Sequence, residues 1–138
     1  MKKFILVFLG LAILLCAAVT ACSDRTVTID GLIPKNITNA ELSGHVHAEA
    51  EETRALTQTE IEELSAWVSK LSLRHRTFEA GEAPGDYNGG SAYTFSFNDG
   101  EASFTWIDIG TKDNKYIRYE NEWYEIRNTL EAPLNLPT

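Results

Sequence analysis

Cysteine is almost absent from this chain of 138 residues: the two that occur are Cys16 and Cys22, both within the first 22 positions. The long stretch after Cys22 contains no thiol, which excludes a disulfide framework inside that stretch. It also excludes a cysteine nucleophile and a zinc site built from cysteine ligands there. The folded part of the protein is therefore expected to be free of both thiols and disulfides.

Basic residues are few as well. Lysine and arginine total 12 against 20 aspartate and glutamate residues, which gives a formal net charge of −8. A nucleic-acid-binding protein needs a basic surface to neutralise phosphates, so this balance argues against that class. Hydrophobic residues make up 43% and aromatic residues 10% of the chain, which is ordinary for a globular protein and excludes a disordered or collagen-like one.

The one long hydrophobic run stands at the beginning of the sequence. Lys2 and Lys3 precede the uncharged segment Phe4–Leu15, and small and apolar residues continue to Cys22. Twelve helical residues rise only about 18 Å, against about 30 Å for the hydrocarbon core of a bilayer. The whole run to Cys22 approaches spanning length, so hydropathy alone leaves a transmembrane helix open. The order of a basic, an apolar and a small-residue region is typical of an export signal.

The end of this run, Val19-Thr20-Ala21-Cys22, resembles the lipobox of bacterial lipoproteins. The resemblance implies that Cys22 carries a diacylglyceryl group as a thioether and that signal peptidase II cleaves after Ala21. It also implies a location at the cell membrane, on its extracytoplasmic face, with the lipid as the anchor. Cys16 is a poorer candidate because the bulky Leu15 precedes it. The alternative is an ordinary cleaved signal with an incidental cysteine at the junction.

The resemblance predicts three parts: a signal peptide at 1–21, a lipidated cysteine with a short tether at 22–25, and a single domain at 26–138. Cleavage would remove two lysines and no acidic residue, leaving 10 basic and 20 acidic residues and a net charge of −10. Two acyl chains anchor a protein durably, whereas a single chain binds only marginally.

One helix and several strands are expected in the domain. Ile61, Leu64 and Val68 give Gln58–Leu71 an apolar stripe at helical spacing, and two capping boxes, Thr57-x-x-Glu60 and Thr59-x-x-Glu62, are available at its start. Strands are predicted by alternation at six further places: Thr26–Asp30, Glu41–Glu51, Ser91–Phe97, Ala102–Ile109, Lys115–Tyr119 and Trp123–Ile126, with Leu73–Phe78 as an additional candidate.

Turn residues connect the later strands. Asn98-Asp99-Gly100 and Glu120-Asn121-Glu122 are typical of tight turns between antiparallel strands, because asparagine, aspartate and glycine accept a positive φ. The expected fold is therefore α+β, a four- or five-stranded antiparallel sheet in a meander with one packed helix. The proline-containing segment Asn128–Thr138 is expected to cover an edge of the sheet.

The segment Trp67–Asn128 resembles small, uncharacterised secreted lipoproteins of Gram-positive bacteria. The resemblance rests on the tryptophan in the helix, an acidic loop with glycine and proline, a Gly89-to-Gly100 stretch with alternating aromatic residues, and the final Asn121-Glu122-Trp123-Tyr124. That family has no assigned activity, so the resemblance implies no functional residue.

His45-x-His47-x-Glu49 is a candidate metal site. Residues i and i+2 of a strand share one face and lie about 6.6–7 Å apart, which allows two imidazoles to bind one divalent cation. Imidazole and carboxylate suit zinc, copper or nickel, and His75 is a candidate third ligand. The alternative is that these side chains only form the solvated face of an amphipathic strand. No other cofactor is expected.

Aromatic residues suggest a second kind of site. Trp106, Tyr116, Tyr119 and Tyr124 are candidates for an exposed platform that binds a glycan or peptide. The alternative is that they fill the core and pair across strands, and this reading is preferred.

Catalysis has little support in the sequence. Asp108, Glu120, Glu122 and Glu125 are available carboxylates, but the sequence contains neither a serine nucleophile elbow nor a His-Glu-x-x-His helix. The sequence therefore favours a monomeric, membrane-tethered, non-catalytic domain that binds an extracytoplasmic protein, peptide or glycan. A divalent-metal-binding lipoprotein and a small cell-envelope hydrolase are the alternatives.

Overall fold

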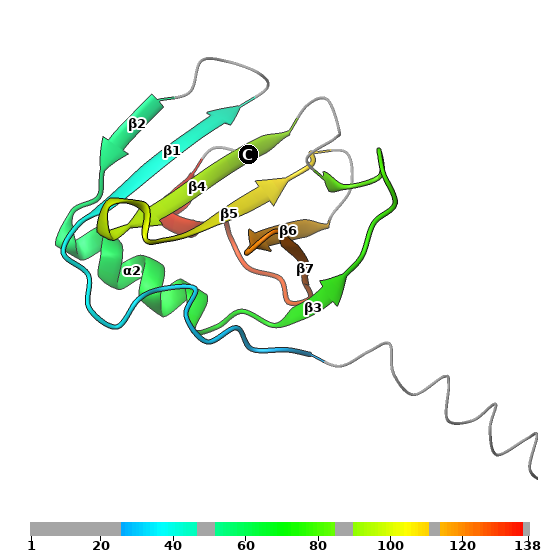
Figure 1. The fold of residues 1–138 in the computed structure, drawn as a ribbon, viewed down its shortest axis with the longest axis horizontal. Helices are drawn as coiled ribbons and strands as arrows, with labels where there is room; N and C mark the ends of the chain where they lie inside the picture. Colours follow the sequence, from blue (N-terminus) through cyan, green and yellow to red (C-terminus); the bar gives the residue numbers. More distant parts are fainter. Residues whose placement is uncertain (1–25, 47–51, 85–89, 111–113, 137–138) are drawn as a thin grey trace, which may run out of the picture.

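Seven antiparallel strands and one α-helix make up the described part of the chain in this computed structural model, which describes residues 26–46, 52–84, 90–110 and 114–136. The strands lie side by side in the order β2-β1-β4-β5-β6-β7-β3 (Figure 1). The elements are β1 (Ala40–Val46), β2 (Glu52–Ala55), α2 (Gln58–Val68), β3 (Leu73–Arg76), β4 (Ser91–Phe97), the 3-10 turn η3 (Asn98–Gly100), β5 (Ala102–Asp108), β6 (Lys115–Tyr119), β7 (Glu122–Ile126) and the 3-10 turn η4 (Pro133–Asn135).

The predicted α+β class with an antiparallel sheet and one helix is confirmed, but the prediction of four or five strands is wrong. Strands β4 to β7 form the predicted meander, in which each strand pairs with the next. Strand β2 was not predicted because its sequence, Glu52–Ala55, has no alternation of apolar residues; it pairs with β1 at the edge of the sheet. The predicted strand Glu41–Glu51 is represented by β1, and its residues 47–51 lie outside the described residues.

The helix begins at the first of the two predicted capping boxes. The backbone N–H of Glu60 donates to the Thr57 hydroxyl at 3.3 Å, and the backbone N–H of Thr57 donates to the Glu60 carboxylate at 2.8 Å. The helix ends at Val68, three residues before the predicted Leu71, and its last turn is closed by the Ser69 N–H bonding to Ser65. No helix in the described ranges is long and apolar enough to cross a membrane.

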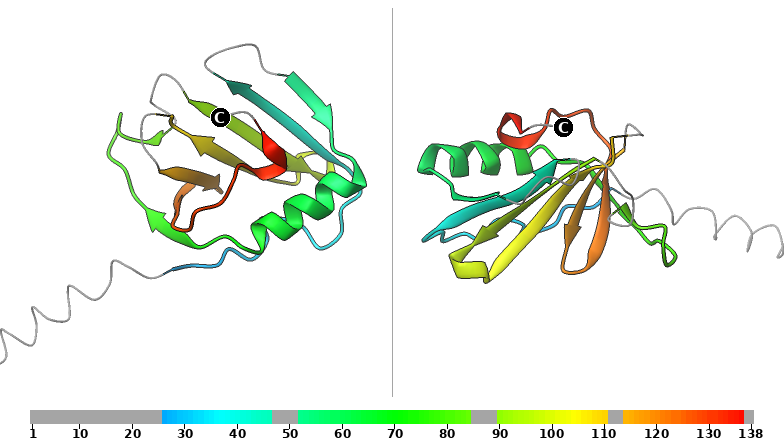
Figure 2. Two further views of the ribbon diagram at one scale, coloured as in Figure 1. Left: turned by 180° about the vertical axis from the view of Figure 1, so that it is seen from behind. Right: turned by 90° about the horizontal axis from the view of Figure 1, so that it is seen from above.

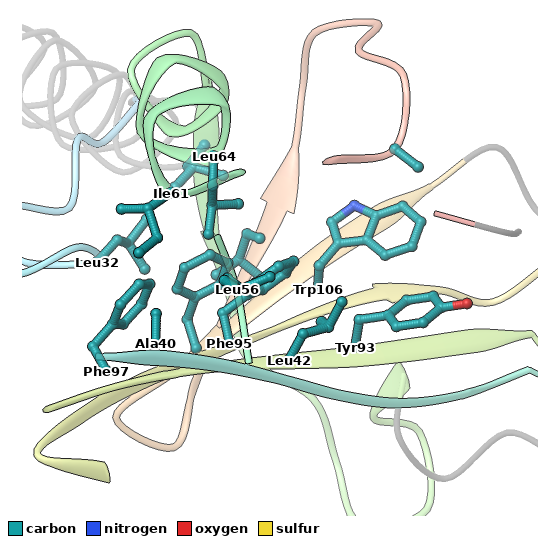
Figure 3. Packing of buried hydrophobic residues seen from close by; sticks show 14 residues of the cluster. Leu32, Ala40, Leu42, Leu56, Ile61, Leu64, Tyr93, Phe95, Phe97 and Trp106 are labelled. Carbon is teal, nitrogen blue, oxygen red and sulfur yellow. The ribbon is translucent and has the colours of Figure 1, made fainter. Parts of the chain in front are cut away.

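The main core lies between α2 and the face of the sheet that the helix covers, here called the main face. In β4 the alternate residues Tyr93, Phe95 and Phe97 are buried on this face, as the sequence pattern predicts. Ile61 and Leu64 point from the helix toward these rings (Figure 3). Stacked aromatic pairs, such as Phe95 and Phe104 with centroids 5.0 Å apart, fill the space between the two layers.

The terminal segments complete this layer. The N–H of Val27 donates to the Leu73 carbonyl at 2.8 Å, which forms an isolated antiparallel bridge where a strand Thr26–Asp30 was predicted. At the other end, the Trp67 indole N–H donates to the Glu131 carbonyl at 2.9 Å. The described part of Asn128–Thr138 therefore lies over the main face beside α2 (Figure 2), and not at a sheet edge as predicted.

The opposite face of the sheet, here called the second face, carries a smaller core. Ile107, Ile109 and Tyr116 are buried there, and Phe78 and Trp123 pack against them. Strand β5 thus buries side chains on both faces toward its end, where Trp106 and Ile107 are consecutive buried residues. Because Phe78 packs against this smaller core, the segment after β3 lies on the second face of β6 and β7.

Candidate functional site

A buried carboxylate on the second face is the centre of the most unusual group of side chains in the described residues. Glu125 stands on β7, with Tyr116 of β6 opposite it on one side and Arg74 of β3 on the other. Its side chain is only 6% exposed. Burying a charge at this level is costly unless the charge is paired and hydrogen-bonded, so its partners explain why it is tolerated.

Three arginines pair with this one carboxylate. Arg74 and Arg76 donate to the same oxygen, Oε2, at 2.9 Å and 2.8 Å, and Arg127 donates to Oε1 at 3.0 Å. Residues two apart on a strand have side chains on the same face. Arg74 and Arg76 of β3 therefore share the second face, and so do Glu125 of β7 and Arg127, which directly follows this strand. The group carries three positive charges and one negative charge.

The environment of Glu125 keeps it ionised. Burial by itself would raise its pKa, but hydrogen bonds from Arg74 and Arg127, together with the charges of Arg74 and Arg76, outweigh burial and lower the pKa below its ordinary value. The carboxylate is therefore a permanent anchor for the three guanidinium groups at neutral pH.

A fourth arginine and three aromatic rings adjoin this group. Arg118 of β6 lies across from Trp123, with its guanidinium carbon 5.4 Å from the ring centroid, and Arg76 is opposite Trp123 on the other side. The Arg76 guanidinium carbon is also 5.8 Å from the Phe78 ring, which packs edge-on against Tyr116 and Trp123. We call Arg74, Arg76, Arg118 and Arg127 the arginine cluster.

The arginine cluster presents donors to solvent. The side chains of Arg76 and Arg127 are 37% and 44% exposed, and Arg118 is exposed as well. A guanidinium group is always charged and offers its N–H donors in a rigid fork that matches carboxylate and phosphate oxygens. Arg76, Arg118 and Arg127 therefore present guanidinium groups to solvent beside the buried Glu125, and their chemistry suits an anionic ligand.

The arginine cluster was not predicted from the sequence, although the sequence contains two patterns that indicate it. Arg74-x-Arg76 and Glu125-x-Arg127 each place two charged residues on one face of a strand. Their meeting depends on the pairing of β3 with β7, which joins segments about 50 residues apart and leaves no local trace in the sequence.

The four aromatic residues predicted as a platform do not share a surface. Trp106 is fully buried in the main core, and Tyr116 is buried on the second face. Tyr119 and Tyr124 are partly buried against the main core. The alternation of strands explains the separation, because Tyr116 and Tyr119 are an odd number of residues apart and point to opposite faces.

The proposed metal ligands are also separated as far as they are described. His45 lies on the second face of β1, whereas His75 lies on the main-face side of β3, with four strands between them, and contacts Glu122 at 2.7 Å. His75 is therefore not the third ligand. The described residues contain no group of three or more metal-binding side chains. His47 and Glu49 lie outside the described residues, so the metal hypothesis stays a prediction, which calorimetry with zinc before and after His45→Ala would test.

The predicted carboxylates do not converge. Asp108 accepts the Gly110 N–H at 2.9 Å and lies 3.5 Å from the Lys115 ammonium group. Glu120 is exposed in the turn between β6 and β7, and Glu122 contacts His75. Glu120 and Glu122 both lie near Tyr124, whose pKa is raised by burial and by these two charges, whereas Asp108 and Glu125 lie apart from them and from each other.

A surface groove of about 390 Å³ lies elsewhere, between residues 28–33 and the C-terminal half of α2. Its lining contains Ile29, Leu32 and Val68, and Asp30 is its one ionisable side chain. The groove offers contact area but few groups that would orient a ligand, so the arginine cluster is the stronger candidate site.

Comparison with known proteins gives no relative: no protein-family model, no curated protein and no solved structure matches this chain.

Proposed function

We propose that this protein is a lipid-anchored, extracytoplasmic, non-catalytic binding domain, and that its arginine cluster binds an anionic group of the ligand. The lipobox resemblance at Cys22 supports the anchor and the address. The arrangement of Arg74, Arg76 and Arg127 around Glu125 is the observation that carries the binding function.

The presence of three arginines at one carboxylate is the reason to propose a ligand. One arginine would neutralise Glu125, and each further arginine at the same carboxylate adds repulsion between like charges. A purely structural ion pair would not require the partly exposed Arg76 and Arg127 in addition to Arg74, in a domain whose acidic residues outnumber its basic ones. An anion bound beside Arg76 and Arg127 would relieve the repulsion.

Arginine also favours binding over catalysis. A guanidinium group stays protonated at neutral pH, so it does not exchange a proton with a substrate. The cluster can bind and orient an anion, and the aromatic rings of Trp123 and Phe78 add apolar contact area next to the charges.

Nuclear magnetic resonance tests the binding function. Sodium pyrophosphate is added to the full chain at constant ionic strength, and the side-chain Nε–Hε signals of the arginines are followed. We expect the signals of Arg76, Arg118 and Arg127 to shift, whereas Arg54, which pairs with Glu60 at the opposite end of the sheet, serves as the internal control. Equal shifts at Arg54, or none at the cluster, would contradict the proposal.

Mass spectrometry tests the anchor. The native product should begin at Cys22 and carry the mass of the acyl chains, and Cys22→Ser should release the protein from the membrane fraction. An unacylated cysteine, or a product that still contains residues 1–21, would refute the proposed anchor.

A further inference from the structure

The described chain enters the domain beside the strand that carries two of the arginines. Val27 bridges to Leu73, and Arg74 and Arg76 are the next residues on the same strand with side chains on the second face. Figure 1 shows the segment that contains Val27 beginning next to β3, and the reverse view in Figure 2 agrees.

The tether limits how the domain can lie on a membrane. If Cys22 carries the lipid, four residue steps separate it from Thr26, and these span at most about 14 Å in any conformation. A domain of this size has a radius of gyration of about 13 Å and is therefore at least about 26 Å wide, so the tether is shorter than the domain is wide. The side that contains β3 is therefore held next to the lipid headgroups.

The distribution of charge on the domain favours one of the orientations on the membrane that the tether allows. The exposed guanidinium groups of Arg76, Arg118 and Arg127 lie on the second face near β3, in a domain that carries an overall negative charge. The exposed residues Glu79 and Glu82, in the loop after β3, oppose an approach of lipid phosphates to that loop. Anionic lipid would attract Arg76, Arg118 and Arg127, which favours the orientation that turns the second face toward the membrane.

From this combination we infer that the arginine cluster docks on the phosphates of anionic phospholipids in the membrane that holds the lipid anchor. The inference rests on the proposed anchor. Trp123, beside Arg118 and Arg76, would lie at the headgroup level, where tryptophan is favoured because it has an apolar ring and a polar N–H group. The ligand of the proposed binding domain is then the membrane itself.

Fluorescence quenching tests the orientation. The protein is expressed at full length, its acylation is confirmed by mass, and it is placed in vesicles of phosphatidylcholine alone or with about one-third phosphatidylglycerol, each containing a nitroxide headgroup lipid. Because no other thiol follows Cys22, one label can be attached through Thr77→Cys, directly after Arg76 and exposed, or through Ala66→Cys, exposed on α2. We expect phosphatidylglycerol to increase quenching at position 77 and not at position 66.

Charge removal identifies the groups responsible. Each arginine near an anionic surface contributes about fivefold to binding, so Arg76→Gln with Arg127→Gln should weaken the preference for the docked orientation about 25-fold. Arg74 keeps Glu125 paired in this variant. The matched control, Arg54→Gln with Lys70→Gln, removes the same charge at exposed positions outside the cluster and should leave quenching unchanged.

High salt provides a further test. Salt of about 1 M shortens the screening length to about 3 Å, so it should abolish the difference in quenching between the two vesicle types in the unmodified protein. A difference that persists in high salt would overturn the inference. Equal quenching at position 77 with and without phosphatidylglycerol in acylated protein would refute the docking of the arginine cluster. It would leave the proposed lipid anchor intact. Pyrophosphate binding to the cluster without any such lipid dependence would assign it to a soluble anion instead. A protein without the acyl mass would overturn the anchor, and docking with it.

Discussion

Replacing Glu125 by glutamine tests the central electrostatic element of the structure. The carboxylate is 6% exposed and accepts hydrogen bonds from three guanidinium groups. Glutamine keeps the shape of the side chain but removes its charge and turns one acceptor oxygen into a donor that faces arginine. It therefore resembles the protonated form of Glu125 more closely than the ionised form.

The magnitude follows from the burial of the partners. Removing one member of a buried ion pair costs about 3–5 kcal/mol, because the remaining charge is left without compensation. Here the arginines can regain water, since Arg74, Arg76 and Arg127 have side chains 22%, 37% and 44% exposed. We therefore expect Glu125→Gln to lower the free energy of unfolding by about 2–3 kcal/mol at neutral pH.

The dependence on pH gives the prediction its sign. The pKa of Glu125 is lower in the folded protein than the ordinary value of 4.5, so its stabilising contribution is complete above that value and disappears as the pH falls through the folded-state pKa. The difference between wild type and Glu125→Gln should shrink toward zero in acid. Other carboxylates, such as Glu60, titrate alike in both proteins and cancel in the comparison.

The assay is urea unfolding of the full chain in detergent micelles, followed by tryptophan fluorescence at neutral pH and at about pH 3. Glu63→Gln, at an exposed position of α2, is the control and should change the free energy by less than about 0.5 kcal/mol. A loss for Glu125→Gln that is the same at both pH values, or no larger than that of Glu63→Gln, would refute the electrostatic reasoning.

Further predictions concern local structure and use the same unfolding assay. Thr57→Ala should cost about 1 kcal/mol by removing the cap of α2, whereas Thr59→Ala should cost less because the second capping box is not the one used; equal losses would contradict this assignment. Gly90→Ala should be strongly destabilising, because a Cβ at this positive φ would collide with the backbone carbonyl of Asp108. Gly100→Ala shares the positive φ but meets nothing within 4 Å, so the excess loss at position 90 measures the collision, and similar losses would argue against it.

Local patterns predicted the strands that neighbour each other in the chain. In β4 the alternation of Tyr93, Phe95 and Phe97 identified both the strand and its buried face. The turn after it was also predictable, since Asn98 and Asp99 adopt the positive φ values of 53° and 57°. In such a meander the partner of each strand is its sequence neighbour, so pattern and turn together suffice.

The edges of the sheet were harder to predict. Strand β2 is four residues long, and Thr53, Arg54 and Ala55 are all exposed, so it has no apolar pattern and exists because β1 offers it an edge. Strand β3 was expected as an additional candidate, but its partner β7 is distant in the sequence. The seven-stranded order therefore depends on long-range pairing that no local window contains.

The candidate site divides in the same way. The sequence by itself determined that the region after Cys22 is free of thiols and acidic, and that it folds as an antiparallel sheet with one capped helix, because composition, alternation and capping act locally. Only the tertiary structure decided that three arginines meet around Glu125 with Arg118 on the same face beside Trp123, and that Trp106 is core and not surface. The physical reason is that charge pairing across strands depends on register and neighbour, which are properties of the assembled sheet.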